Sequence, residues 1–328
     1  MPTRAVVRSI ARYTPQRVLT NADLETLVDT TDEWIMQRTG IRERRIAADN
    51  ETCSMMATRA AKDALSRAGV DPMDIDMIVM GTVTGDMLWP STSCLVQEAI
   101  GAKNAAAFDV GAACAGFIYS LAVATAMIEN RQIQKALVIG ADILSKFVNW
   151  EDRSTCVLFG DGAGAVVLDG QVGTDRGVIK TALLADGSGA KHIDMEVGGS
   201  LHPACDPRSK HYRSTIYMAG TEVYRFAVKA MGDACTKVLA EAGMNSEDVD
   251  LFVPHQANLR IIDSAAERLG LPDEKVFRNV ERYGNTSAAS IPIGLSEAAE
   301  RGQLRPGMVV MTVGFGAGLV WGANLIRW

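Results

Sequence analysis

Two patterns of apolar and polar positions each occur twice along this chain. Residues 64–79 and 238–253 both predict a helix that ends near a glycine, an acidic turn and an apolar strand. Residues 109–137 and 279–308 both combine the end of a strand, a helix rich in small residues and a further strand. Such repeats are typical of duplicated βαβ units. The sequence therefore predicts an α/β fold built from two pseudo-symmetric halves.

The repeats place the boundary between the halves near residues 169–177. The N-terminal half then covers residues 1–172 and the C-terminal half covers residues 173–328. A chain of 328 residues is long enough for two units with cores of their own, and 48% hydrophobic residues is ordinary for a globular protein.

Residues 110–128 carry no charge and exceed the ~17 residues that a membrane helix needs. A membrane span is therefore one interpretation of this stretch. It is, however, rich in Ala, Gly, Ser and Thr, and only some of its side chains are strongly lipophilic. A small-residue helix buried between two protein layers fits this composition better, and Cys114 would lie at its start.

A glycine-rich run at residues 160–164 (Gly-Asp-Gly-Ala-Gly) raises the alternative of a dinucleotide-binding loop. That fingerprint must follow a strand and open a helix, whereas residues 165–168 continue as an apolar strand. The glycines are therefore expected to permit tight strand packing. Asp161 is expected to be a turn residue, with acid–base catalysis as the alternative.

The formal net charge of −6 argues against non-specific adsorption to nucleic acids or membranes. Six cysteines are spread along the chain without paired short spacings, which is typical of reduced thiols in a cytoplasmic protein rather than of a disulfide framework. Residues 1–10 lack the apolar segment of a secretory signal. We interpret them as a first strand, although their arginines faintly imitate a transit peptide.

One polar region concentrates residue types that bind metals. It contains His192, His202, Cys205 and His211. Their spacing matches none of the common zinc modules, and the region is rich in Gly, Pro, Ser and Arg. A flexible surface loop is therefore the preferred interpretation, and no metal site is expected.

Three dispersed polar residues, Cys114, His255 and Asn285, are the main candidates for chemistry. A cysteine of unknown surroundings is more often a small core residue. Cys114, however, stands among Gly and Ala before an apolar helix, and a helix N-terminus favours the nucleophilic thiolate. The segments around His255 and Asn285 are not core-like, so both side chains are expected to project into a pocket. Together the three supply a nucleophile and two neutral groups able to hold a thioester oxygen.

The segments that contain these residues resemble the β-ketoacyl-acyl carrier protein synthase III family of the thiolase superfamily. The resemblance runs from Arg4 to Trp328. The matching segments, in the family's order, are residues 32–44, 109–116, 150–156, 159–164, 254–258, 283–289 and 314–322. The family fold is a layered αβαβα arrangement of two halves, with the pocket at their junction.

The resemblance implies a decarboxylative Claisen condensation. Cys114 would take an acyl group from acyl-coenzyme A. Malonyl-acyl carrier protein would then lose carbon dioxide, and the resulting enolate would attack the acyl-cysteine. His255 and Asn285 would stabilise the enolate oxygen. The amides of Cys114 and Ala317 would hold the second oxyanion, and Phe315 would desolvate the malonyl carboxylate. No metal or flavin cofactor is implied, since coenzyme A enters as part of a substrate.

The resemblance also assigns residues to substrate binding. Trp34 would stack on the adenine of coenzyme A, and Arg38 and Arg153 would bind its phosphates. Asn258 and Gly220 would line the tunnel for pantetheine. The alternatives are a core position for Trp34 and solvated charge for the two arginines. Residues 198–214 look extended compared with the family pattern, which leaves the local pocket shape open.

Two protein partners are expected from the resemblance. Residues 84–91 match the family region that crosses a homodimer interface to floor the partner's acyl pocket. Trp89 falls at the floor position, and a packing anchor in the dimer contact is the alternative. The chain is acidic, so docking of an acidic carrier protein needs a local basic patch. Arg225, Arg260 and Arg268, on predicted helices, are the candidates.

Other classes share parts of this pattern. A non-catalytic thiolase-like binding protein would keep the fold without the chemistry, yet all three catalytic candidates are present. A hydroxymethylglutaryl-coenzyme A synthase or a specialised-metabolite acyltransferase shares the cysteine and the histidine, but residues 284–287 favour synthase III. Primer length and branching stay open, although an indole at position 89 favours a short primer such as acetyl-coenzyme A.

Overall fold

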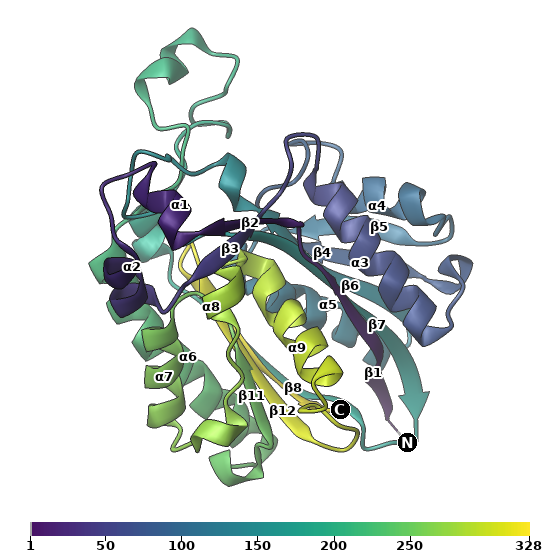
Figure 1. Ribbon diagram of the computed structural model, residues 1–328. Coiled ribbons are helices and arrows are strands. Elements are labelled where there is room, and N and C mark those ends of the chain that lie inside the picture. Colours follow the sequence, from purple (N-terminus) through teal and green to yellow (C-terminus); the bar gives the residue numbers. More distant parts are fainter. Residues whose placement is uncertain (1) are drawn as a thin grey trace.

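The computed structural model describes residues 2–328, so only Met1 of the predicted N-terminal half lies outside it. Two main β-sheets face each other across a pair of helices (Figure 1). The strand order of the first sheet is β1 (Thr3–Tyr13), β7 (Asp161–Val172), β6 (Lys135–Ile143), β4 (Met77–Gly81), β5 (Ala106–Val110). The order of the second is β8 (Gly177–Ala185), β13 (Val320–Arg327), β12 (Val309–Gly316), β11 (Leu251–Pro254).

The two sheets share one pattern of strand directions. β1, β7 and β6 pair antiparallel, whereas β6, β4 and β5 pair parallel. In the second sheet β8, β13 and β12 pair antiparallel, and β12 pairs parallel with β11. The strands of the first sheet come from residues 3–172 and those of the second from residues 177–327. The chain therefore changes sheets in the short segment between β7 and β8.

Both ends of the chain lie beside this segment. Thr3 pairs with Val172 at the end of β7, and Arg327 pairs with Gly177 at the start of β8. Nε of Arg176 also donates a hydrogen bond to the backbone oxygen of Trp328, at 3.2 Å. The N and C labels accordingly lie close together in Figure 1.

Helices form three layers around the sheets. α5 (Gly116–Glu129) and α9 (Ser290–Glu300) lie between the two sheets. The outer face of the first sheet is covered by α3 (Cys53–Ala68) and α4 (Thr92–Ile100). The outer face of the second is covered by α6 (Gly220–Ala242), with α7 (Leu259–Arg268) beside it. The order is αβαβα, which confirms the predicted fold class.

The first predicted repeat is present in both halves. α3 ends at Ala68 and α6 ends at Ala242, and the next residue in each case is a left-handed glycine. The φ angle is +62° at Gly69 and +67° at Gly243, a conformation that glycine adopts without a steric penalty. The turns Pro72–Asp74 and Ser246–Asp248 then lead to the buried strands β4 and β11.

The second repeat contains a pair of unusual turns that lie against each other. The 3-10 turn Ala113–Ala115 leads directly into α5, and the turn Ser287–Ala289 leads directly into α9. The first residue of each turn is left-handed although it carries a side chain, with φ of +43° at Ala113 and +51° at Ser287. Non-glycine residues in this conformation are strained and concentrate at functional sites. The starts of both central helices therefore meet at the junction of the halves.

The uncharged stretch at residues 110–128 contains α5, which contacts strands of both sheets. Phe117, Ile118 and Leu121 of this helix are almost completely buried. The helix approaches the first sheet so closely that a Cβ on Gly81 of β4 would lie 2.3 Å from the carbonyl carbon of Gly116. The prediction of a small-residue helix between two layers is thus confirmed. No helix within residues 2–328 is long and apolar enough to span a bilayer.

We expect Gly81→Ala to displace the start of α5 and the turn that carries Cys114. The atom it would meet belongs to backbone, so a side-chain rotation cannot relieve the contact. Overpacking of this kind typically costs about 1–3 kcal/mol. Thermal unfolding and alkylation of Cys114 measure the two effects. Gly111→Ala is the control, because its Cβ would meet no atom within 4 Å. Equal behaviour of the two variants would contradict the expectation.

Asp161 begins β7 and is fully buried, so its assignment to a turn was wrong. Its carboxylate accepts hydrogen bonds from the backbone of Ala47 (2.8 Å), and from the backbone (2.9 Å) and hydroxyl (2.5 Å) of Ser145. Burial raises the pKa of this carboxyl. A Cβ on Gly164 would lie 2.6 Å from Cβ of Pro292 in α9. The glycine run therefore allows β7 to pack closely against α9. A dinucleotide-binding loop would be followed by a helix, whereas this run continues as a strand.

Smaller elements surround the junction of the halves. They are α1 (Asn21–Glu25), α2 (Asp32–Thr39), α8 (Val280–Tyr283), β2 (Arg17–Thr20) with β3 (Glu43–Ile46), and β9 (Ile193–Asp194) with β10 (Tyr217–Met218). Residues 195–216, between β9 and β10, form the teal-green segment that projects from the body in Figure 1. Within it the rings of His202 and Tyr212 stack, with centroids 3.5 Å apart. Nowhere in residues 2–328 do three His, Cys, Asp or Glu side chains gather to hold a metal.

Candidate active site

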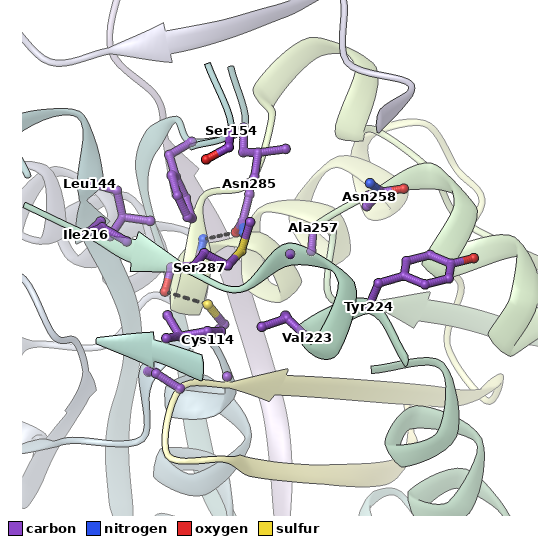
Figure 2. Close-up of a pocket in the computed structure, with 18 of the residues that line it drawn as sticks. Cys114, Leu144, Ser154, Ile216, Val223, Tyr224, Ala257, Asn258, Asn285 and Ser287 are labelled. Atoms are coloured by element: carbon purple, nitrogen blue, oxygen red, sulfur yellow. Dashed lines mark hydrogen bonds between the residues drawn. The ribbon is translucent and has the colours of Figure 1, made fainter. Parts of the chain in front are cut away.

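A pocket of about 610 Å³ opens at the junction of the two halves. Cys114, His255 and Asn285 all line it, and so do Phe315 and Ala317 near the end of β12. Figure 2 shows Ser287 between Cys114 and Asn285, with hydrogen bonds to both. The three dispersed candidates are therefore brought to one cavity, the cysteine from the first half and the other two from the second.

Cys114 lies in the 3-10 turn that precedes α5, close to its predicted place at the start of the helix. Burial raises the pKa of its thiol to about 12, although the hydrogen bond from Ser287 opposes this effect. The Ser287 hydroxyl donates to Cys114 Sγ at 3.2 Å. The expectation of a thiolate at neutral pH is thus contradicted. Burial therefore opposes the thiolate that a helix N-terminus favours, and the raised pKa indicates a thiol at rest.

His255 follows β11 and is only 1% exposed. Its Nδ1 lies 2.6 Å from the hydroxyl of Ser290 at the start of α9, and its ring meets Phe315 edge to face. Burial lowers the pKa of His255 to about 3, so the imidazole is neutral at pH 7. Nε2 has no hydrogen-bond partner within residues 2–328. With Ser290 donating to Nδ1, the ring proton is on Nε2, which is then the available donor.

Asn285 is fixed by its own backbone and by its side chain. Its N–H donates to Leu158 O (2.8 Å), and its carbonyl accepts from Gly160 N (3.0 Å). Its Oδ1 accepts a hydrogen bond from Ser287 N at 2.9 Å. This contact orients the amide so that the NH₂ group is left as a donor. His255 and Asn285 therefore supply two neutral donors, the kind of group that stabilises a developing oxyanion.

The end of β12 presses against the cysteine turn. A Cβ on Gly316 would lie 2.5 Å from the backbone nitrogen of Cys114, so only glycine allows this approach. Phe315 and Ala317, on either side of Gly316, line the pocket, and Phe315 is 4% exposed. The structure thus places both residues beside the nucleophile. Their roles in oxyanion binding and desolvation stay predictions.

The structure also brings Trp34, Arg38 and Arg153 together. The guanidinium carbons of Arg38 and Arg153 lie 4.9 Å and 5.2 Å from the centroid of the Trp34 ring. Trp34 is half-buried, and both Trp34 and Arg38 line the pocket. Arg153 also lies 3.6 Å from Asp29. An indole with two guanidinium groups suits an aromatic base that carries phosphates, although binding of coenzyme A at this place stays a prediction.

Asn258 and Gly220 both line the pocket, as the tunnel prediction requires. Asn258 caps α7, because its Oδ1 accepts a hydrogen bond from Arg260 N at 2.9 Å. Its Nδ2 donates to the backbone oxygen of Arg38, also at 2.9 Å. Asn258 thus ties α7 to α2 at the pocket wall. Gly220 is the first residue of α6.

The remaining candidates lie outside the cavity or at its rim. Trp89 is 78% exposed and does not line the pocket of its own chain. Arg260 lines the pocket and lies over the Tyr224 ring, and Arg225 is exposed on α6. Arg268 is already paired with Asp233. Of the three candidate arginines, Arg268 is therefore the least available for a partner.

Some pocket residues were missed in the sequence. The base of the projecting segment contributes part of the wall through Ile193, Asp194, Met195, Ile216 and Met218. The sequence predicts a surface loop between them, and the apolar residues on both flanks of that loop are the signal for a pocket wall. The buried hydroxyl of Ser287 lies inside the matched segment 283–289, and that of Ser290 lies directly after it. Only the three-dimensional contacts show which groups they touch.

Comparison with known proteins gives one consistent family. Residues 108–187 match the model of 3-oxoacyl-[acyl-carrier-protein] synthase III, and residues 239–328 match the model of its C-terminal region. The β-ketoacyl-[acyl-carrier-protein] synthase III of Symbiobacterium thermophilum is 52% identical, and the alignment covers 98% of this chain and 97% of the relative.

Solved structures agree with this result. The 3-oxoacyl-[acyl-carrier-protein] synthase III of Aquifex aeolicus VF5 superimposes with a TM-score of 0.92 at 46% identity, covering 99% of this chain and 100% of that one. The priming β-ketosynthase of the R1128 polyketide biosynthetic pathway superimposes with a TM-score of 0.93 at 37% identity, covering 99% and 97%.

Proposed function

Because the chain belongs to the β-ketoacyl-acyl carrier protein synthase III family, we propose that it is a condensing acyltransferase that starts fatty acid biosynthesis. It joins an acyl-coenzyme A primer to malonyl-acyl carrier protein with loss of carbon dioxide. The observation that carries this proposal is the convergence of Cys114, His255 and Asn285 on one pocket. Cys114 suits the role of nucleophile, and His255 and Asn285 suit the role of oxyanion donors. The proposed reaction needs both roles.

The first half-reaction is acyl transfer to Cys114. The sulfur attacks the carbonyl of the primer thioester, and the thiol of coenzyme A leaves. The amides of Cys114 and Ala317 are the proposed donors to the oxyanion of the tetrahedral intermediate. This role is supported by the close approach of Gly316 to the turn that contains Cys114. The approach places the peptide units next to Cys114 and Ala317 side by side.

The second half-reaction is decarboxylation followed by carbon–carbon bond formation. Loss of carbon dioxide leaves an enolate whose oxygen is held by Nε2 of His255 and Nδ2 of Asn285. Neutral donors suit this task, because the histidine keeps its proton throughout and needs no charge change. Phe315, at the edge of the imidazole, presents an apolar face to the carboxylate that leaves. The enolate carbon then attacks the acyl-cysteine.

Intact-mass measurement tests the proposal in two steps. Incubation with acetyl-coenzyme A is expected to add one acetyl group to the protein, at Cys114. Addition of malonyl-acyl carrier protein is then expected to remove that group and yield acetoacetyl-carrier protein. A protein that binds acyl-coenzyme A but gains no mass would be a binding protein with this fold rather than an enzyme. Undiminished activity in the presence of EDTA is expected, because the proposed steps use only side chains and amides of the chain.

The similarity to a priming ketosynthase of a polyketide pathway supports one alternative function. The same chemistry could prime a specialised-metabolite pathway instead of fatty acid synthesis. Competition between the malonyl-loaded carrier protein of fatty acid synthesis and that of a polyketide pathway separates the two roles. A preference for the first supports the proposed function.

Two partners are part of the proposal. An acidic carrier protein is expected to dock near Arg225 and Arg260, which are exposed beside the pocket mouth. A second copy of the chain is expected to cover the exposed apolar residues Val83, Met87, Leu88 and Trp89, which follow β4. We also place the enzyme in the cytoplasm, where its unpaired cysteines stay reduced.

We expect Trp89→Ala to lengthen the acyl chain that the enzyme accepts. In the proposed dimer the indole of one chain closes the acyl pocket of the other, so that a short primer fits best. Its 78% exposure in the single chain is consistent with a place in such an interface. Specificity constants for acetyl-, butyryl- and octanoyl-coenzyme A measure the change. A wild type that already prefers octanoyl, or a variant with unchanged preference, would show that Trp89 only anchors the dimer.

A further inference from the structure

Gln256 follows His255 directly in the sequence, yet the steps above do not use it. The residue is 1% exposed, and it does not line the pocket. A side-chain amide has two N–H donors and two acceptor lone pairs, and leaving them unpaired in the interior is costly. The partners that Gln256 binds therefore show which parts of the chain it holds together.

All four hydrogen-bonding positions of the Gln256 amide are occupied. Nε2 donates to the backbone oxygens of Pro254 (2.9 Å) and Phe277 (3.2 Å). Oε1 accepts from the backbone nitrogens of Asn279 (3.0 Å) and Val280 (3.2 Å). Backbone oxygens only accept and backbone N–H groups only donate, so these partners fix the orientation of the amide. The side chain therefore joins the end of β11 to the start of α8.

α8 depends on this contact, because it has little stability of its own. It is the single turn Val280–Tyr283, and a helix this short is unstable by itself. Its N-cap residue, Asn279, makes no side-chain cap, since its Nδ2 donates to Glu297 Oε2 at 2.8 Å. Oε1 of Gln256 instead binds free N–H groups at the start of the turn. Gln256 thus caps α8 from a distant part of the sequence.

The two segments that Gln256 joins carry the two proposed oxyanion donors. His255 is the residue before Gln256, and Gly284 and Asn285 directly follow α8. Gly284 N donates to Val280 O at 2.9 Å, which ties the end of the turn to its start. One buried amide therefore links the backbone beside His255 to the turn that leads to Asn285.

We propose that Gln256 is a positioning residue that fixes the spacing between the donors His255 and Asn285. It holds α8 against the end of β11, so that Nε2 of His255 and Nδ2 of Asn285 reach one oxygen atom. A misplacement of about 1 Å can cost about 10²-fold in rate. The inference rests on the proposed function, in which malonyl decarboxylation needs both donors and acyl transfer to Cys114 does not form the enolate.

Three variants of the full-length protein test this role. Gln256→Met keeps the length of the side chain and removes all four hydrogen bonds. Gln256→Asn keeps the amide but is one methylene shorter, so it cannot bind both segments at once. It is the milder change, and it decides the test where the methionine variant does not fold. The control is Asn324→Leu, because Asn324 is a buried amide of the same half that is bonded to Thr312 and Thr181.

The two half-reactions separate positioning from general stability. We expect Gln256→Met to slow carbon dioxide release from malonyl-acyl carrier protein about 10²-fold, and Gln256→Asn to slow it less. Both variants should acylate Cys114 from acetyl-coenzyme A at close to the wild-type rate. Asn324→Leu should retain both half-reactions even where thermal unfolding shows an equal loss of stability. Wild-type decarboxylation in a folded Gln256 variant, a shared loss of both half-reactions, or an equal loss in Asn324→Leu would overturn the proposal.

Hydrogen exchange tests the same role without any substrate. The N–H groups of Gly284 and Asn285 donate to Val280 O and Leu158 O, so neither touches Gln256. Both are expected to exchange faster in the Gln256 variants, because α8 loosens, and at the wild-type rate in Asn324→Leu. Unchanged exchange would overturn the positioning role. If exchange follows the expectation while the wild type fails to decarboxylate malonyl-acyl carrier protein, the positioning role stands and the proposed function falls.

Discussion

Cys114→Ser is expected to fold, to form no stable acyl-enzyme and to lose at least about 10³-fold in condensation, as nucleophile replacements do elsewhere. The pocket holds no strong base. The pKa of His255 is lowered to about 3, and burial already keeps the more acidic thiol protonated at rest. A serine hydroxyl at the same position is far harder to deprotonate than a thiol. Intact mass after incubation with acetyl-coenzyme A measures the loss of the acyl adduct.

The other cysteines provide the control for this result. Cys94 and Cys205 are exposed, whereas Cys156 is buried. None of these three lines the pocket. An acyl label found on any of them in the wild type, after digestion and peptide mapping, would remove Cys114 from its role.

His255→Ala and Asn285→Ala are expected to slow malonyl decarboxylation about 10²–10³-fold each, the usual cost of one oxyanion donor. Transfer of the acyl group from coenzyme A to Cys114 does not form the enolate, so His255→Ala should spare it. Release of carbon dioxide and growth of the acyl-enzyme measure the two half-reactions separately. If both variants decarboxylated normally and failed only in acylation, the assignment of the two donors would be wrong.

Asn285 needs a second substitution, because its side chain has two functions. Its Oδ1 holds the backbone of Ser287, so the alanine variant also disturbs the hydroxyl that touches Cys114. Asn285→Asp retains an accepting oxygen for Ser287 N but replaces the NH₂ donor by a carboxylate oxygen, which adds a negative charge to the pocket. It is therefore expected to lose decarboxylation while keeping the backbone of Ser287 in place better than Asn285→Ala does.

Much of this architecture could be predicted because it depends on local sequence patterns, and each of these patterns occurs once in each half. The helix–glycine–turn–strand pattern around Gly69 recurs around Gly243, and both glycines are left-handed in the structure. The small-residue composition of residues 110–128 likewise reflects direct contact of α5 with two sheets. Cys114, His255 and Asn285 stand in distinctive segments, so they were found without knowledge of their contacts.

The errors arose where the three-dimensional surroundings decide the property. A thiol at a helix start is expected to ionise, but the pKa of Cys114 is set by burial that no local pattern reports. Asp161 looked like a turn residue because glycines surround it, yet those glycines make room for α9 against a strand. Asp142 and Ala288 are 146 positions apart in the sequence, and the hydrogen bond from Ala288 N to Asp142 Oδ2 exists only because the two halves pack together.

The proximity of the two chain ends to the segment between β7 and β8 has a consequence for engineering. Thr3 pairs beside Val172, and Arg327 pairs beside Gly177, so a short linker from Trp328 to Pro2 would close the ring with little rearrangement. New termini opened within residues 173–176 would then yield a circular permutant in which the ribosome makes the histidine-bearing half first. Its pocket would be assembled from the same pieces in the opposite order of synthesis. The chemistry is thus expected to depend on how the two halves pack and not on their order along the polypeptide.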